Sequence, residues 1–230
     1  MAIGMARWMG FTINDNFDSP YKSSSITEFW RRWHMSLSSW LKDYLYISLG
    51  GNRVGRFRQY LNLMITMILG GLWHGAHFNF IVWGAMHGLA LAFDKMRSSI
   101  KFLPAGRTGG NTDSKILKIV GIILTFHFVC LCWIFFKASS FHDAEIILTQ
   151  IFTNFNGSAW KPMLQAYGVV FGVMLMGYII HFFPKSYESL SVNVLSKITL
   201  VGRIAIMLIF IWIIIQVKQA DQVMPIYLQF

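Results

Sequence analysis

The sequence predicts an all-α integral membrane protein with about four transmembrane helices, a short re-entrant helix and an interfacial amphipathic helix. Hydrophobic residues make up 55% of the 230 residues and charged residues only 13%, whereas soluble globular proteins carry about 25% charged residues. Four stretches are apolar over nearly the length of about 20 residues that a helix needs to cross a bilayer. So much apolar side chain excludes a disordered chain and leaves too little polar surface to cover a water-soluble fold.

The apolar stretches follow one another through the last two thirds of the chain. A fifth and shorter piece, Leu61–Trp73, contains the pair Gly70-Gly71, and we expect it to be a re-entrant helix broken at these glycines. The predicted transmembrane helices are Phe78–Phe93, Ile116–Phe136, Met163–Phe183 and Leu200–Val217.

The basic residues predict the orientation of these segments. Seven Lys and Arg lie within residues 22–58, six within 94–118 and three within 184–203. Cytoplasmic loops of membrane proteins carry such an excess, so these three stretches are predicted to be cytoplasmic. The loop 137–161 and the C-terminus then face outward. The net charge of +10 therefore predicts contact with the bilayer and no nucleic-acid partner.

Residues Ser25–Leu45 have the pattern of an amphipathic helix at the cytoplasmic face. Ser25 followed by Glu28 forms a capping box, and aromatic and aliphatic residues recur at spacings of three and four. Arg31 and Arg32 fall between them. Taken alone, the pattern favours an interfacial helix that contacts lipid headgroups. His34 fits this interpretation less well, because it lies four residues after Trp30 on the apolar stripe.

The segment Leu49–Arg53 reads Leu-Gly-Gly-Asn-Arg, which is a turn by composition. Arg53 begins a basic group that continues with Arg56 and Arg58. This group fits a site for the phosphates of a cytoplasmic donor or an anchor for anionic lipid, and the sequence alone favours the lipid anchor.

Residues 70–77 read Gly-Gly-Leu-Trp-His-Gly-Ala-His and carry the strongest chemical signal. Ionisable groups at membrane depth are costly and often mark a reaction site, and the imidazole of His74 has the chemistry of a general base. A packing histidine is the plainer interpretation. A metal site formed by His74, His77 and His87 is a third, but no Cys, Asp or Glu lies near them in sequence, and no metal is predicted.

Six distinctive motifs follow one another along the chain, and a seventh distinctive segment forms its C-terminus. The motifs are Phe17–Tyr21, Glu28–Ser38, Asp43–Tyr46, Leu49–Arg53, Gly70–Ala76 and Trp83–Gly88, and the ending is Pro225–Phe230.

Together these motifs closely resemble the membrane-bound O-acyltransferase family, in its bacterial alginate O-acetyltransferase branch. The resemblance implies a single domain over residues 1–230 that corresponds to the C-terminal half of the family's domain. Within it we expect a cytoplasmic amphipathic and basic region at 1–60, a histidine-bearing membrane core at 61–93 and three further transmembrane helices at 94–230.

The resemblance also implies an activity. An acetyl group passes from a cytoplasmic thioester donor, acetyl-CoA or an acyl carrier, to hydroxyls of an exported polysaccharide such as alginate, and no cofactor stays bound. His74 matches the catalytic histidine and His34 the second histidine of the branch. Arg31, Arg32 and Arg53 are candidates for donor contacts. The implied location is the bacterial inner membrane as a multi-pass protein.

The expected partners are the bilayer, the polysaccharide, periplasmic acetyltransferase proteins and a separately encoded N-terminal half. Two alternatives stay open within the family: D-alanyl transfer to teichoic acid and O-acetylation of peptidoglycan. A third alternative is a truncated, non-catalytic scaffold for a periplasmic transferase.

Overall fold

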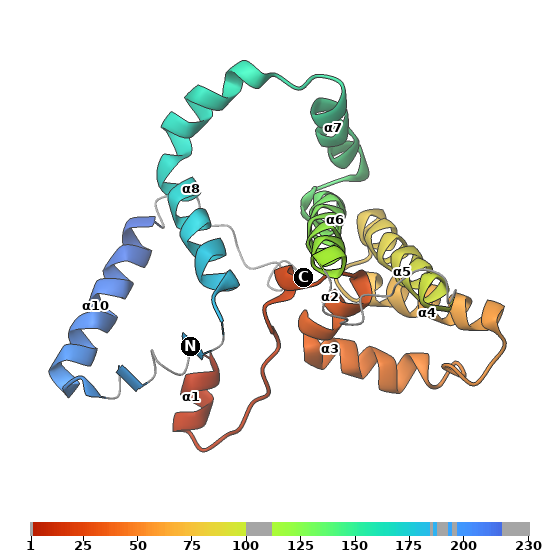
Figure 1. Ribbon diagram of the computed structural model, residues 1–230, viewed down its shortest axis with the longest axis horizontal. Coiled ribbons are helices and arrows are strands. Elements are labelled where there is room, and N and C mark those ends of the chain that lie inside the picture. Colours follow the sequence, from red (N-terminus) through yellow and green to blue (C-terminus); the bar gives the residue numbers. More distant parts are fainter. Residues whose placement is uncertain (1, 100–111, 185, 188–192, 195–196, 218–230) are drawn as a thin grey trace. The chain divides into compact units, whose positions relative to one another are not determined.

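A computed structural model describes residues 2–99, 112–184, 186–187, 193–194 and 197–217. Every regular element in these ranges is helical (Figure 1), which confirms the predicted all-α class. The chain divides into two units, Met1–Phe171 and Gly172–Phe230, and each is described here by itself. The subdivision at residues 60 and 93 stays a prediction.

The first unit begins with short helices and continues with long ones. The short elements are α1 (Ala2–Trp8), the 3-10 turn η1 (Pro20–Lys22), α2 (Ile26–Arg32), α3 (Met35–Trp40) and the π-helix η2 (Leu41–Tyr46). The later elements of this unit are α4 (Arg56–Leu72), α5 (Phe78–Ser99), α6 (Thr112–Lys137), α7 (Phe141–Phe152) and η3 (Gly157–Ala159). Helix α8 (Trp160–Phe182) begins in the first unit and ends in the second, which also contains α10 (Leu200–Val217).

The predicted amphipathic helix is wrong as one continuous element. Its start is confirmed, because the Ser25 side chain accepts a hydrogen bond from the Glu28 amide. The helix ends at Arg32, however, and Trp33 and His34 separate it from α3. His34 has φ 46°, a left-handed conformation that interrupts a right-handed helix. The hydrophobic pattern did not reveal this break, because it continues on both sides of it.

The predicted break at Gly70-Gly71 is also wrong. Helix α4 runs through both glycines to Leu72. Gly71 and Gly84 allow α4 and α5 to pack closely. A Cβ on Gly71 would collide with the carbonyl oxygen of Phe80 in α5, and a Cβ on Gly84 would collide with the carbonyl oxygen of Met67 in α4. The two helices can approach this closely only because neither residue has a side chain.

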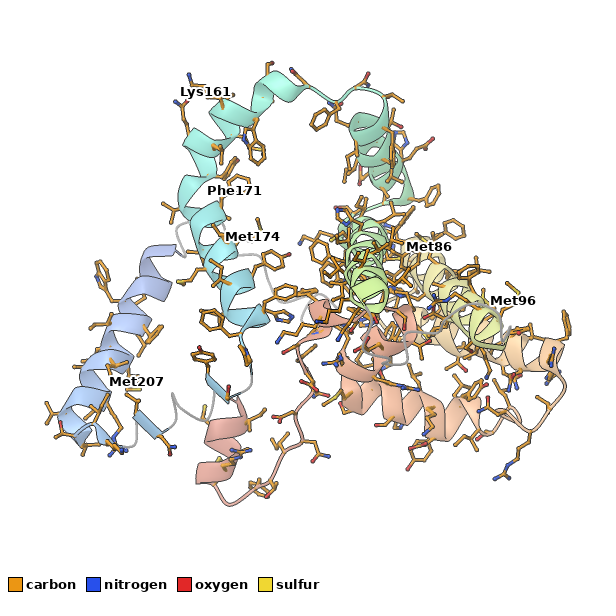
Figure 2. All side chains as sticks on the ribbon, viewed as in Figure 1. Met86, Met96, Lys161, Phe171, Met174 and Met207 are labelled. Carbon is orange, nitrogen blue, oxygen red and sulfur yellow. The ribbon has the colours of Figure 1, made fainter. Side chains whose placement is uncertain are left out.

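The core of the first unit lies where α2 packs against α4, α5 and α6. Its buried residues are Ile26, Phe29 and Trp30 from α2, Met67 from α4, Trp83 from α5, and Val129 and Cys132 from α6. Figure 2 labels Met86, which packs against this cluster, and Met96, which lies further along α5 and is exposed. The short helix α2 is therefore part of the core and does not lie free on a surface.

Two helical stretches of the described residues meet the length and hydropathy of a membrane span, Lys115–Lys137 and Gly157–Phe182. They match two of the four predicted transmembrane helices. In α5 the predicted span Phe78–Phe93 is followed by Asp94, Lys95 and Arg97, and in α10 the apolar stretch Leu200–Trp212 is shorter than a full span. The count of four spans is thus not confirmed and stays a prediction.

The second unit and the segment before it show apolar side chains at their surface. No residue of α8 is buried, and Met174 and Met207, labelled in Figure 2, are exposed. Such surfaces fit contact with lipid. The predicted outward loop 137–161 contains helix α7. Part of the predicted cytoplasmic stretches 94–118 and 184–203, the C-terminus and the motif Pro225–Phe230 lie outside the described residues.

Candidate active site

His34 stands at the break between α2 and α3. It occupies the N-cap position of α3 with φ 46° and ψ 54°, and its side chain makes no capping hydrogen bond. Burial lowers the pKa of His34 below its ordinary value, so the imidazole is neutral at neutral pH and can accept a proton. Its Nδ1 is buried and has no hydrogen-bond partner among the described residues.

His74 stands at the joint between α4 and α5, just after the end of α4. Its amide donates to the Gly71 carbonyl over 2.9 Å, which tightens the last turn of the helix. Gly75 follows with φ 154°, a conformation that favours glycine. The side chain of His74 is buried, at 7% exposure.

An aromatic cage surrounds the imidazole of His74. The ring centroids of Trp73 and Phe136 are each 4.9 Å from that of His74, Trp83 is at 5.4 Å and Phe80 at 6.2 Å. The contributors come from α5, α6 and the α4–α5 joint. Such walls exclude water from one side of the imidazole and strengthen electrostatic interactions there.

The structure brings the two predicted site histidines together. Trp73 contacts both rings, with centroid distances of 6.2 Å to His34 and 4.9 Å to His74. The two histidines are 40 positions apart in the sequence and come from different elements. The two imidazoles therefore share Trp73 as a common neighbour.

The three predicted donor-binding arginines differ in their surroundings. Arg32 is held by Glu28, with Nη2 and Nε at 2.9 and 3.1 Å from Oε1, and Nη1 also donates to the Asp18 carbonyl. Burial alone would raise the pKa of Glu28, but hydrogen bonds from Ser24 and the charge of Arg32 lower it. Arg31 and Arg53 are exposed. Arg32 thus binds Glu28 and Asp18, whereas donor contacts of Arg31 and Arg53 stay a prediction.

A buried hydrogen bond that the sequence pattern did not reveal joins α2 to α5. Trp30 Nε1 donates to His87 Nδ1 over 3.2 Å, and His87 is fully buried. Because Nδ1 accepts, the proton of the neutral ring is on Nε2. The Thr27 amide and hydroxyl both donate to Asp94 Oδ2, so α2 has two polar attachments to α5. These attachments fix the helix that ends just before His34.

Replacing His87 with Phe should destabilise the protein. Phe keeps the ring but removes the Nδ1 acceptor, so the buried Trp30 N–H loses its partner at a cost of about 1–3 kcal/mol. We expect the detergent-solubilised variant to unfold at a lower temperature. Trp30→Phe should act similarly, and the double variant should lose less than the sum of the two. Strict additivity would show that the two side chains are not coupled.

Three further histidines of the first unit lie at its surface. His77 is exposed, His127 is exposed on α6 with its ring nitrogen 2.8 Å from the Ile123 carbonyl, and His142 lies 3.7 Å from Glu145. In the described part of the chain, no group of three or more His, Cys, Asp or Glu side chains is arranged to hold a metal ion. The residues that sequence reasoning missed are the cage aromatics, especially Phe136, since nothing in the sequence near Phe136 points to His74.

Comparison with known families gives one match. The model of the MBOAT, membrane-bound O-acyltransferase family, matches residues 1–104, which include His34, His74 and His87.

Several curated proteins are similar over a longer part of the chain. The probable alginate O-acetylase AlgI of Pseudomonas aeruginosa is 47% identical over 153 residues, covering 66% of this chain and 27% of the relative. The peptidoglycan O-acetyltransferase of Helicobacter pylori is 44% identical over 64% of this chain and 27% of the relative. The teichoic acid D-alanyltransferase of Bacillus subtilis is 30% identical over 61% and 36%. The chain thus spans about a quarter to a third of the length of these relatives.

Proposed function

We propose that the chain belongs to the membrane-bound O-acyltransferase family, whose model matches residues 1–104, and that it forms the catalytic part of a membrane enzyme that acetylates an exported polysaccharide. The observation that carries the proposal is the pair of His34 and His74, whose rings both contact Trp73 at the α4–α5 joint. The three relatives are named for acyl transfer to alginate, peptidoglycan and teichoic acid. Alginate or a similar polymer is the proposed acceptor, because the relatives named as probable alginate O-acetylases are 45–51% identical to this chain.

In the proposed mechanism, an imidazole nitrogen of His74 takes the proton of an acceptor hydroxyl. The hydroxyl oxygen attacks the carbonyl carbon of the thioester, and a carbon–oxygen bond forms as the carbon–sulfur bond breaks. The thiolate leaves and takes up the proton from the His74 imidazolium, which returns the histidine to its neutral state. The buried aromatic cage favours the neutral imidazole between turnovers and keeps bulk water from the thioester.

His34 assists this transfer by orienting the donor or by sharing the proton. It has the neutral ring and the buried Nδ1 that such a role needs. The proposed donor is acetyl-CoA or an acyl-carrier thioester on the cytoplasmic side, where Arg31 and Arg53 offer exposed positive charge to its phosphates. No cofactor is proposed to stay bound.

The proposed setting is the bacterial inner membrane, with several passes of the chain. Partners that would complete the enzyme are periplasmic acetyltransferase proteins and a separately encoded N-terminal half. The two apolar spans and the basic residues of the first 58 positions support this placement.

The proposal is tested by deleting the gene in its native host and restoring it on a plasmid. We expect the exported polysaccharide to lose its acetyl esters in the deletion strain and to regain them on complementation. Return of D-alanyl esters on teichoic acid, or of acetyl groups on peptidoglycan, would instead support the other acceptors. Unchanged esters on all three polymers would overturn the proposed enzyme, and esters that a His74→Asn chain restores as fully as the parent would favour a non-catalytic scaffold.

A further inference from the structure

The break that carries His34 is held by a segment that lies earlier in the chain, about halfway between Met1 and His34. A left-handed conformation costs a residue with a side chain roughly 1–2 kcal/mol, so the backbone at His34 needs support from elsewhere. The first amides of α3 also lack partners within their own helix, and the His34 side chain does not cap them.

Asn16 supplies both missing acceptors from a distance of about 20 positions. Its backbone carbonyl accepts a hydrogen bond from the Met35 amide over 2.9 Å, and its side-chain Oδ1 accepts one from the Ser36 amide over 2.9 Å. These are the first two amides of α3. Asn16 therefore does the work of an N-cap for a helix to which it does not belong.

The other side of the break is held by the same segment. The Asp18 amide donates to the Arg32 carbonyl over 2.9 Å, and Arg32 Nη1 donates to the Asp18 carbonyl over 3.2 Å. Between these attachments, the Phe17 ring lies 4.9 Å from the Trp33 ring and 6.1 Å from the His34 ring. Residues Asn16–Asp18 thus contact the chain before, at and after His34.

We propose that Asn16 is a positioning residue that sets the place of His34 beside Trp73 and His74. The inference rests on the proposed function for its effect on turnover, but its structural part stands on the two hydrogen bonds to α3. Asn16 acts through His34 and does not itself meet the reacting atoms. Loss of its side-chain acceptor should loosen the start of α3 and shift the imidazole that this backbone carries.

The test compares Asn16→Ala with Asn16→Asp in membranes of the complemented host. Ala removes the Oδ1 acceptor, whereas Asp keeps it and adds a charge that is favourable at a helix N-terminus. Since a displacement of about 1 Å can reduce a rate roughly 100-fold, we expect Asn16→Ala to lower kcat by about 10- to 100-fold with little change in KM. Asn16→Asp should restore most of the activity.

Ser140→Ala is the matched control, because it removes a side-chain acceptor from the start of another helix. The Ser140 hydroxyl accepts from the Asp143 amide over 3.1 Å, at the start of α7, which packs against α6. Amide hydrogen exchange should quicken at Met35 and Ser36 in Asn16→Ala and near Asp143 in Ser140→Ala. Only the first variant should lose acetyl transfer.

Two failures can be told apart. If Asn16→Ala speeds exchange at Ser36 but transfers acetyl groups at the parent rate, Asn16 is a structural cap and the positioning role is overturned. If Asn16→Asp is as inactive as Asn16→Ala, the acceptor is not the reason for the loss, and the inference also fails. If His74→Asn transfers at the parent rate as well, the proposed function itself is wrong.

Discussion

His74→Asn should reduce acetylation of the exported polysaccharide by about 100-fold or more, because general acid–base catalysis contributes roughly 10²–10⁴ to a rate. Asn has a similar polar shape but cannot take up a proton at neutral pH, so the aromatic cage keeps an occupant while the base is lost. The measurement is the content of polymer-bound acetyl esters in the deletion strain that carries the variant, normalised to the amount of protein in the membrane.

His77→Asn is the matched control for this loss. His77 lies three residues further along the chain and is exposed, and it contacts none of the rings of the cage. We expect parent-level esters from this variant. Parent-level esters from His74→Asn would exclude His74 as the base, and a loss from both variants would point to an effect of the joint on folding.

Gly84→Ala should strongly destabilise the protein. The added Cβ would collide with the Met67 carbonyl oxygen and lie 2.9 Å from the Ile68 Cα. Both are backbone atoms of α4, which cannot rotate away as a side chain can. The helices must therefore separate, and overpacking of this kind costs about 1–3 kcal/mol, occasionally more. Thermal unfolding of the detergent-solubilised protein measures the effect, and acetyl transfer should fall with it, because α4 and α5 meet at His74.

Gly172→Ala offers the comparison at a glycine in the interior of α8. No atom lies within 4 Å of a Cβ built there, and Ala favours a helix over Gly by about 1 kcal/mol. This variant should be as stable as the parent or slightly more so. Equal destabilisation by Gly84→Ala and Gly172→Ala would show that close packing of α4 on α5 is not what requires Gly84.

The site residues stay a prediction from the sequence, whereas the backbone that presents them differs from the one that the sequence predicts. His34 and His74 were named from their motifs, and the structure places both against Trp73. Arg32 is a predicted donor contact, and the structure adds that its guanidinium already binds Glu28 and Asp18. His87 was considered only as a metal ligand, and its hydrogen bond to Trp30 depends on a residue 57 positions away.

Features set by neighbouring residues were determined by the sequence itself. The cap at Ser25, the turn with positive φ at Gly50 and Gly51 and the apolar length of α6 and α8 all follow from local hydrogen bonding, backbone freedom and hydropathy. Each of these depends on residues within a few positions or within one segment.

Only the tertiary structure decided that the helix breaks at His34 and continues through Gly70 and Gly71. The break needs the acceptors of Asn16, and the continuity makes room for the backbone of α5 at Phe80. The local pattern is the same whether a glycine ends a helix or admits a neighbouring one, and the choice depends on the free energy of contacts between distant segments. The joining of two histidines into one candidate site has the same origin.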